Sequence, residues 1–247
     1  MEYPVNLAAP IRMRHLILFG MLATAATAAP LKFTSGENRV HLIELYSSEG
    51  CSSCPPAEAW LGGLYDAPGL WRDFVPVAFH VSYWDRLGWP DRFATKENTA
   101  RHYSYANLWH GDSVYTPELV LDGTEWWSAF EGNPPPASSE KAGMLAVDYA
   151  DDGVCRVTFS LSGDYEMHAA LLGGGIFSSL RAGENKGRML HHEFVVLAIK
   201  SARLTAGAAE LSLPKSTDKT IARQALAIWV TQRSELAPRQ ATGGWVE

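Results

Sequence analysis

Ile43-Glu-Leu-Tyr-Ser-Ser-Glu-Gly-Cys-Ser-Ser-Cys-Pro-Pro-Ala57 is the stretch of the 247-residue chain on which the predicted fold depends. Its first residues are apolar and β-prone, so we expect a strand over residues 40–46, followed by a polar turn. The two prolines fit only the first turn of a helix, because proline has no backbone N–H. A helix is therefore expected over residues 54–64, with Cys51 and Cys54 between the strand and the helix.

The position of the two cysteines favours thiol chemistry. A helix N-terminus presents unpaired N–H groups and a partial positive charge, which stabilise a thiolate, the reactive form in disulfide exchange. The i, i+3 spacing brings the two sulfurs within reach across one turn. We predict that Cys51 is the exposed attacking thiol and Cys54 the buried resolving thiol. Two alternatives stay open, a permanently oxidised structural disulfide and half of a metal site.

A metal site at the cysteines would need more ligands, because structural zinc sites usually have four. Cys155 and His80 are the plausible additions, although Cys155 lies in an alternating segment and is expected to be a buried apolar thiol. His191 and His192 are adjacent, so on a strand they point to opposite faces and form a poor bidentate site. Residues 183–187 have the composition of a turn and lack the motif of a phosphate-binding loop. The sequence thus predicts neither a metal nor a cofactor.

A second strand, expected over residues 74–81, leads into polar and aromatic side chains. The carboxyl ends of strands face the ligand crevice in open α/β sheets. Tyr83 and Trp84 are therefore predicted to bind substrate, and His80 to transfer a proton near neutral pH. Glu44 is unexpected within a strand, and a buried carboxyl group with a raised pKa could accept the proton of Cys54. A core histidine and an ion pair of Glu44 with an arginine are the structural alternatives.

The rest of the chain divides into two parts with different patterns. A helix over residues 95–108 and a short strand over 118–121 are followed by Asp122-Gly123, a hairpin turn signal. Residues 131–140 contain three consecutive prolines and no apolar period. Beyond them the apolar segments are short and separated by turns. We predict a first domain over residues 30–132, a linker over 133–140 and a β-rich domain over 141–247.

The N-terminus and the overall charge bear on location and partners. Residues 1–29 resemble an export signal, with a basic flank, an apolar run over 16–22 and small residues at 26–28. That run is shorter than the roughly 20 residues that span a bilayer. A periplasmic or secreted protein is expected, with no stable membrane span after signal removal. The formal net charge of −6 provides no basic field for nucleic acid.

Several motifs together resemble a bacterial secreted family known as the domain of unknown function 1223. The similarity covers residues 43–57, 79–85, 87–89, 114–117, 120–123, 181–185 and 190–192. It implies a thioredoxin-like fold, in which a cis proline faces the cysteine pair. By position this is Thr116-Pro117, whose backbone would bind substrate. Ser82 and Glu118 depart from the family pattern, and the charge of Glu118 near the cysteines would raise the pKa of Cys51.

The sequence thus predicts an α/β thioredoxin-like domain, a mixed sheet flanked by helices, followed by a small β-rich sandwich-like domain. The expected function is that of an exported thiol–disulfide oxidoreductase using Cys51 and Cys54. Its partners would be a protein or small-molecule thiol or disulfide and a redox partner. The alternatives are a binding module with a structural disulfide, and a metal-binding protein that combines the cysteine pair with His80.

Overall fold

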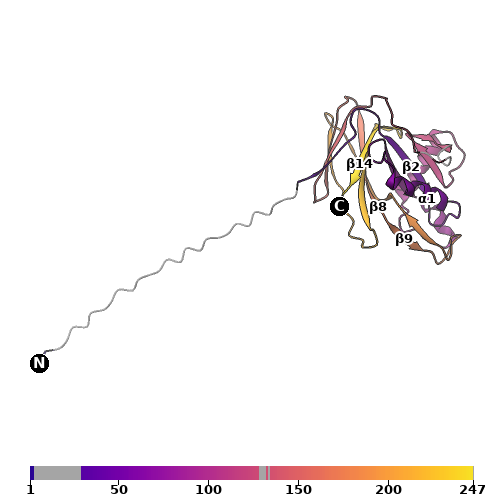
Figure 1. Cartoon of the computed structure of the whole chain (residues 1–247), viewed down its shortest axis with the longest axis horizontal. Helices are drawn as coiled ribbons and strands as arrows, with labels where there is room; N and C mark the ends of the chain where they lie inside the picture. The colour runs from indigo at the N-terminus through magenta and orange to yellow at the C-terminus, as the bar shows by residue number, and fades with distance from the viewer. Residues whose placement is uncertain (3–28, 128–131, 133, 247) are drawn as a thin grey trace.

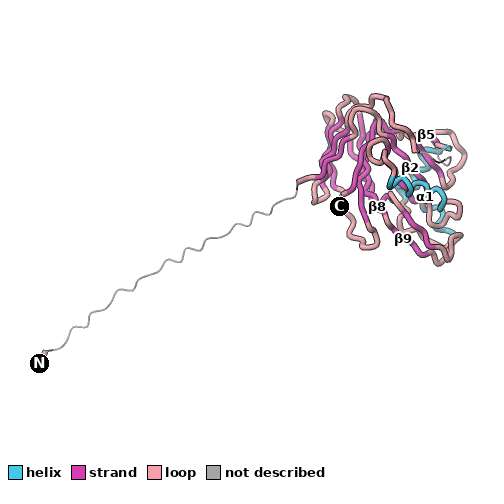
Figure 2. The backbone as a smooth tube through the Cα atoms, viewed as in Figure 1, coloured by secondary structure: helices cyan, strands magenta, loops and turns pink. Residues whose placement is uncertain are grey.

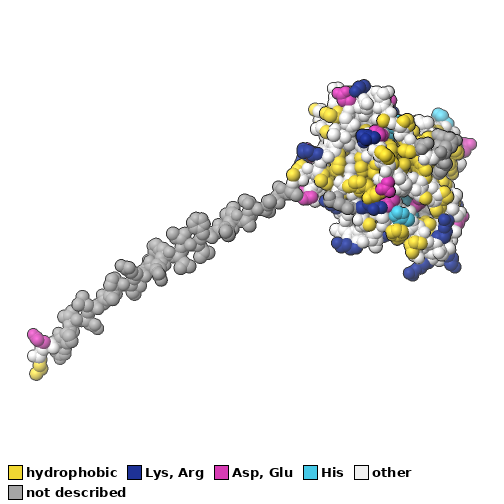
Figure 3. Space-filling view, viewed as in Figure 1, with side chains coloured by type: hydrophobic (Ala, Val, Ile, Leu, Met, Phe, Trp, Pro, Cys, Tyr) yellow, Lys and Arg dark blue, Asp and Glu magenta, His cyan; other side chains and the backbone are white. Residues whose placement is uncertain are grey.

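The computed structural model describes residues 1–2, 29–127, 132 and 134–246 (Figure 1). The predicted export signal therefore lies almost wholly outside the described residues, as does part of the predicted linker. Within the described part of the chain, no helix is long and apolar enough to cross a membrane. Figure 3 shows acidic and basic side chains interspersed with apolar ones on the visible face.

The elements expected over residues 40–46, 54–64, 74–81, 95–108 and 118–121 are present with similar bounds. In the first part these are β1 (Leu31–Thr34), β2 (His41–Ser47), α1 (Pro55–Gly63), η1 (Leu64–Asp66), β3 (Phe74–His80), η2 (Ser82–Leu87), α2 (Lys96–Leu108), β4 (Glu118–Leu121) and β5 (Thr124–Glu125). In the second part they are β6 (Leu145–Tyr149), β7 (Val154–Phe159), β8 (Tyr165–Gly174), β9 (Ile176–Ser179), β10 (Met189–His192), β11 (Val195–Arg203), β12 (Ala208–Ser212), β13 (Arg223–Gln232) and β14 (Pro238–Trp245).

The predicted fold class is wrong. The described residues form a mostly β structure with two α-helices and three sheets (Figure 2). Strands of both sequence segments share one eight-stranded sheet, in the order β14-β13-β8-β11-β3-β2-β4-β5. The α/β thioredoxin-like domain with its own helix-flanked sheet and the separate sandwich-like domain are not found. The physical reason is that β3 pairs with β2 on one edge and with β11 on the other, so its sheet continues into the second segment.

The other sheets complete the fold around this large one. A four-stranded sheet, β1-β6-β7-β12, covers one face of β8 and β13, and the pair β9-β10 forms a separate hairpin. Strand β14 contacts β1 and β2, so the last strand lies against the first two strands (Figure 1).

Strand β13 contributes to two hydrophobic cores at once. Because successive side chains of a strand point to opposite faces, Ala225, Ala227 and Trp229 enter the core shared with β2 and β3. The alternating residues Leu226, Ile228 and Val230 enter the core below the four-stranded sheet. Both sets are fully buried, which explains the continuous apolar run of this segment.

A buried ion pair ties α2 to β2. Arg101 donates to both carboxylate oxygens of Glu44, at 2.8 and 2.9 Å. The hydroxyls of Tyr46 and Tyr105 also donate to Glu44, at 2.9 and 2.6 Å. Glu44 is almost completely buried, and these partners satisfy the charge that is unexpected within a strand.

We expect Arg101→Met to destabilise the protein by about 3–5 kcal/mol, because it leaves the carboxylate of Glu44 buried without its cation. Arg156→Met is the matched control. The ion pair of Arg156 with Glu210 joins two side chains that are more than half exposed, and such pairs contribute at most about 1 kcal/mol. Urea unfolding measures both. Equal losses in the two variants would contradict the structural importance of the buried pair.

Candidate functional site

Cys51 and Cys54 form a disulfide, with their Cα atoms 5.4 Å apart. Cys54 is the N-cap residue of α1, and its carbonyl oxygen accepts hydrogen bonds from the N–H groups of Ala57 and Glu58. The expected position between strand and helix is therefore confirmed. The expected exposure of Cys51 is wrong, because both cysteines are 0 % exposed.

The Thr116–Pro117 peptide bond is cis and lies against the disulfide. The carbonyl oxygen of Thr116 is 3.7 Å from Cys51 Sγ and accepts a hydrogen bond from Ser53 Oγ at 3.3 Å. Trp84 Nε1 donates to Thr116 Oγ1 at 2.8 Å. The structure thus brings the cysteine pair, Thr116-Pro117 and Trp84 together, as the sequence predicted.

Tyr83 lies beside Trp84 in the turn η2. Burial raises the pKa of the Tyr83 hydroxyl well above its usual range. Tyr83, Trp84, Tyr115 and Thr116 line a surface groove, and Thr116 also contacts Cys51. The two aromatic residues predicted to bind substrate therefore lie at an open surface, and the cysteines lie below it.

Residues 181–188, here called the covering loop, connect β9 to β10 and close over the cysteines. Glu184 Oε2 accepts hydrogen bonds from the backbone N–H and the hydroxyl of Ser52, at 3.1 and 2.7 Å. The Asn185 side chain is fully buried and donates to the carbonyl oxygens of Glu49 and Cys51, at 2.9 and 2.8 Å. The sequence predicted a turn over residues 183–187 and also allowed Glu184 to join a polar cluster against the first domain, but it did not predict a contact with the cysteines.

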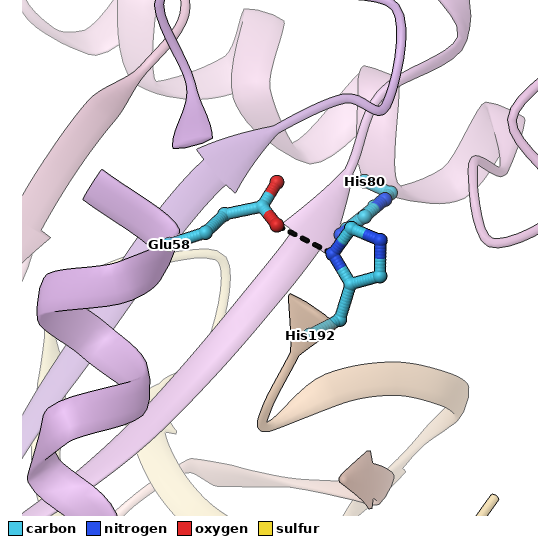
Figure 4. A group of neighbouring side chains, drawn as sticks. All are labelled: Glu58, His80 and His192. Atoms are coloured by element: carbon cyan, nitrogen blue, oxygen red, sulfur yellow. Dashed lines mark hydrogen bonds and ion pairs between the residues drawn. The ribbon is translucent and has the colours of Figure 1, made fainter. Parts of the chain in front are cut away.

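Behind the disulfide lies a cluster of charged side chains, Glu49, Glu58, His80, Asp91 and His192, hereafter the buried cluster. All five residues are less than 9 % exposed. His80 Nδ1 donates to Asp91 at 2.6 Å, and His192 Nδ1 donates to Glu58. His192 Nε2 lies 3.3 Å from Glu49 Oε1. Figure 4 shows Glu58 on α1, His80 at the end of β3 and His192 on β10 pointing toward one another.

The carboxylates and histidines of the buried cluster shift one another's pKa values. Burial disfavours the imidazolium of His192, but Glu58 and Glu49 overcome this and raise its pKa to about 10. Burial likewise opposes ionisation of Asp91, but His80 and backbone N–H groups lower its pKa to about 2. The pKa of His80 is raised in the same way, against burial, by Asp91 and Glu58. The buried cluster is therefore a set of paired charges.

Two residues considered in the sequence have other partners. Glu44, predicted to take the proton of Cys54, binds Arg101 and two tyrosines instead of the cysteine loop. Glu118 accepts a hydrogen bond from His102 Nε2 at 2.9 Å, and His102 thus provides a counter-group for its carboxylate.

His80 was predicted from the sequence as a site residue, but the other four residues of the buried cluster were not. The opposite directions of His191 and His192 were expected, and on β10 the first is exposed while the second is buried. The two histidines were judged only as a pair of metal ligands, and a role for His192 by itself was not predicted. Glu58 follows Cys54 by four residues, so on a helix it lies on the same face as the cysteine. This spacing of four residues could have indicated that Glu58 lies near the cysteine pair.

Fold and site together define a mostly β protein with a buried Cys-Ser-Ser-Cys disulfide at a helix N-terminus. The family of proteins of unknown function 1223 matches residues 42–231, and the chain belongs to this family. No curated protein matches the chain.

Two solved structures share the fold. A crystal structure of an Agrobacterium tumefaciens protein is 21 % identical, with a TM-score of 0.59, and the match covers 85 % of this chain and 95 % of that one. HBP35 of Porphyromonas gingivalis is 11 % identical, with a TM-score of 0.52, and the match covers 85 % of this chain and 76 % of that one. At these identities the likeness concerns the fold alone.

Cys155 is a free and buried thiol on β7, as expected, and burial raises its pKa to about 12. We therefore expect iodoacetamide to leave the native oxidised protein unlabelled at pH 7–9. Mass spectrometry should find one label after unfolding without reductant, and three after unfolding with reductant, since the chain has three cysteines. Labelling of Cys155 in the folded protein would contradict the burial of this thiol.

Proposed function

We propose that the chain is a thiol–disulfide oxidoreductase that uses Cys51 and Cys54, as the sequence predicted. The observation that carries this proposal is the position of the disulfide, which lies at the N-terminus of α1 with the carbonyl of Thr116 facing Cys51. The helix N-terminus would stabilise a thiolate, and backbone groups beside the cysteines would hold an extended substrate.

In the proposed oxidation of a substrate, its thiolate attacks Cys51 Sγ. The Cys51–Cys54 bond breaks, a mixed disulfide forms at Cys51, and Cys54 leaves as a thiolate at the helix N-terminus. A second substrate thiolate then attacks the substrate sulfur of the mixed disulfide and releases Cys51 as a thiolate. The substrate loses two electrons and the cysteine pair gains them. In the reverse direction, the Cys51 thiolate attacks a substrate disulfide and Cys54 resolves the product.

The partners that fit this chemistry are a protein or small-molecule thiol or disulfide and a second redox partner that resets the cysteines. Tyr83, Trp84 and Thr116 are proposed to contact the substrate, because they line one groove and Thr116 also contacts Cys51. The proposed location is periplasmic or secreted, because an oxidising compartment would maintain the disulfide.

The covering loop decides whether a substrate can reach Cys51. Both cysteines are 0 % exposed, so exchange requires the contacts of Glu184 and Asn185 to open. The same burial favours a second candidate function, a binding module whose disulfide is structural. Accessibility and redox potential distinguish the two candidates.

A redox titration against glutathione and dithiothreitol tests the proposed function. We expect a potential above roughly −300 mV, the value below which structural disulfides usually fall. With a substrate disulfide, Cys54→Ser should accumulate a mixed disulfide at Cys51, and Cys51→Ser should not react. Cys155→Ser is the matched control and should behave like the unaltered protein. A pair that stays oxidised well below −300 mV would establish the structural alternative.

Asn185→Ala should accelerate reduction of the folded protein by dithiothreitol about 30-fold. The change removes two hydrogen bonds that hold the covering loop closed, each worth about 1 kcal/mol. Stopped-flow measurement of the reduction rate checks this. Lys186→Ala is the control, because Lys186 is exposed in the same loop. Equal rates for all three proteins would contradict a gating role of the loop.

A further inference from the structure

Three side chains of the buried cluster have the geometry of a metal site that does not include the cysteines. Glu58, His80 and His192 each offer one ligand atom, and these atoms all lie within 4.8 Å of one another. The residues come from α1, β3 and β10, and each is held by rigid secondary structure (Figure 4). Tetrahedral bonds of about 2.0–2.2 Å place ligand atoms about 3.4 Å apart. Binding an ion therefore requires Glu58 and His192, now in hydrogen-bond contact, to separate slightly.

The second observation is a ring nitrogen without a partner. His80 is 0 % exposed, and its Nε2 atom has no hydrogen-bond partner among the described residues. Its other nitrogen, Nδ1, is held by Asp91 at 2.6 Å. Metal-binding histidines typically have this arrangement, in which a carboxylate on one nitrogen orients the ring and leaves the other nitrogen for the ion.

His192 repeats the arrangement. Its Nε2 atom lies 3.3 Å from Glu49 Oε1, while Nδ1 contacts Glu58. Both atoms of the Glu49–His192 approach are buried and lack an aligned hydrogen bond. Glu49 is itself fixed by Trp89, whose Nε1 donates to Glu49 Oε2 at 2.6 Å. Each histidine therefore has one ring nitrogen next to a carboxylate, Asp91 for His80 and Glu49 for His192, and Glu58 lies between the two rings.

We propose that Glu58, His80 and His192 bind one Zn²⁺ ion, with Asp91 and Glu49 as the carboxylates that orient the two histidines. Two imidazoles and one carboxylate suit zinc, whereas Mg²⁺ and Ca²⁺ prefer oxygen ligands. One Zn²⁺ ion with two neutral imidazoles offsets the three carboxylates of the buried cluster to the same extent as two imidazolium rings, since each arrangement adds two positive charges.

An entry path supports this assignment. Glu58 also lines a surface groove between α1 and β10, together with Pro55, Gly62 and Leu190. An ion can therefore approach Glu58 from a groove whose lining includes Arg188 of the covering loop but neither cysteine. The site is independent of the redox state of the cysteines, because all three ligands are nitrogen or oxygen donors.

The test uses the full chain with its disulfide intact, stripped with a chelator and titrated with Co²⁺ and then with Zn²⁺. We expect one Co²⁺ per chain, the visible absorption bands of a tetrahedral nitrogen–oxygen site, no thiolate-to-metal band in the near ultraviolet, and displacement by Zn²⁺. His192→Gln and His80→Gln should weaken Zn²⁺ binding about 100-fold or more, and Asp91→Asn about 10–100-fold. His191→Gln, which changes the exposed neighbour, should bind like the unaltered protein.

The spectrum of the unaltered protein keeps the proposal testable even where a variant fails to fold. Absence of Zn²⁺ uptake by the folded protein at about 0.1 mM free ion, an absorption band from thiolate ligands, or an equal loss in His191→Gln would overturn it. The Cys51→Ser/Cys54→Ser variant should retain the ion. That result separates failure of the zinc site from failure of the proposed thiol chemistry, which this variant removes.

Discussion

The fold depends on two strands, β8 and β13, that are buried on both faces. Along β13, Ala225, Ala227 and Trp229 pack toward β2 and β3, while the residues between them pack toward the four-stranded sheet. A one-residue shift of register would exchange these two sets and disrupt both cores. Strand β8 also pairs with β11, which lies beside β3. Strand β11 follows directly on β10, which carries His192 to the cysteine side of the molecule.

The sequence predicted local elements better than it predicted the fold. Apolar runs, prolines and the Asp122-Gly123 turn placed the strands and helices, because these signals act within a few residues. The alternation of strand and helix before residue 125 is compatible with a separate α/β domain. The contact between Ala78 and Val195 is not visible in either segment alone, since it depends on which strand edge is left open in the folded chain.

In the site, too, features that depend on neighbouring residues were predicted and features that depend on distant segments were not. The cysteine pair and the Thr116-Pro117 bond belong to compact motifs, so the sequence could place them. The burial of Cys51 could not be predicted, because Glu184 and Asn185 reach it from more than a hundred residues away. The buried cluster could not be predicted either. Its members come from separate segments, and each acidic or histidine side chain by itself resembles an ordinary surface residue.

The junction of β11 with β3 also has a consequence for how the chain folds. All seven residues of β3 are buried, yet one edge of this strand has no partner until β11 joins it. During synthesis the first half of the chain would expose an apolar strand edge until residues beyond 195 emerge, and such edges are sites of aggregation. Many contacts join distant parts of the sequence, which places the protein among slow-folding, high-contact-order topologies. A chaperone that shields β3 would therefore act chiefly on the unfinished chain.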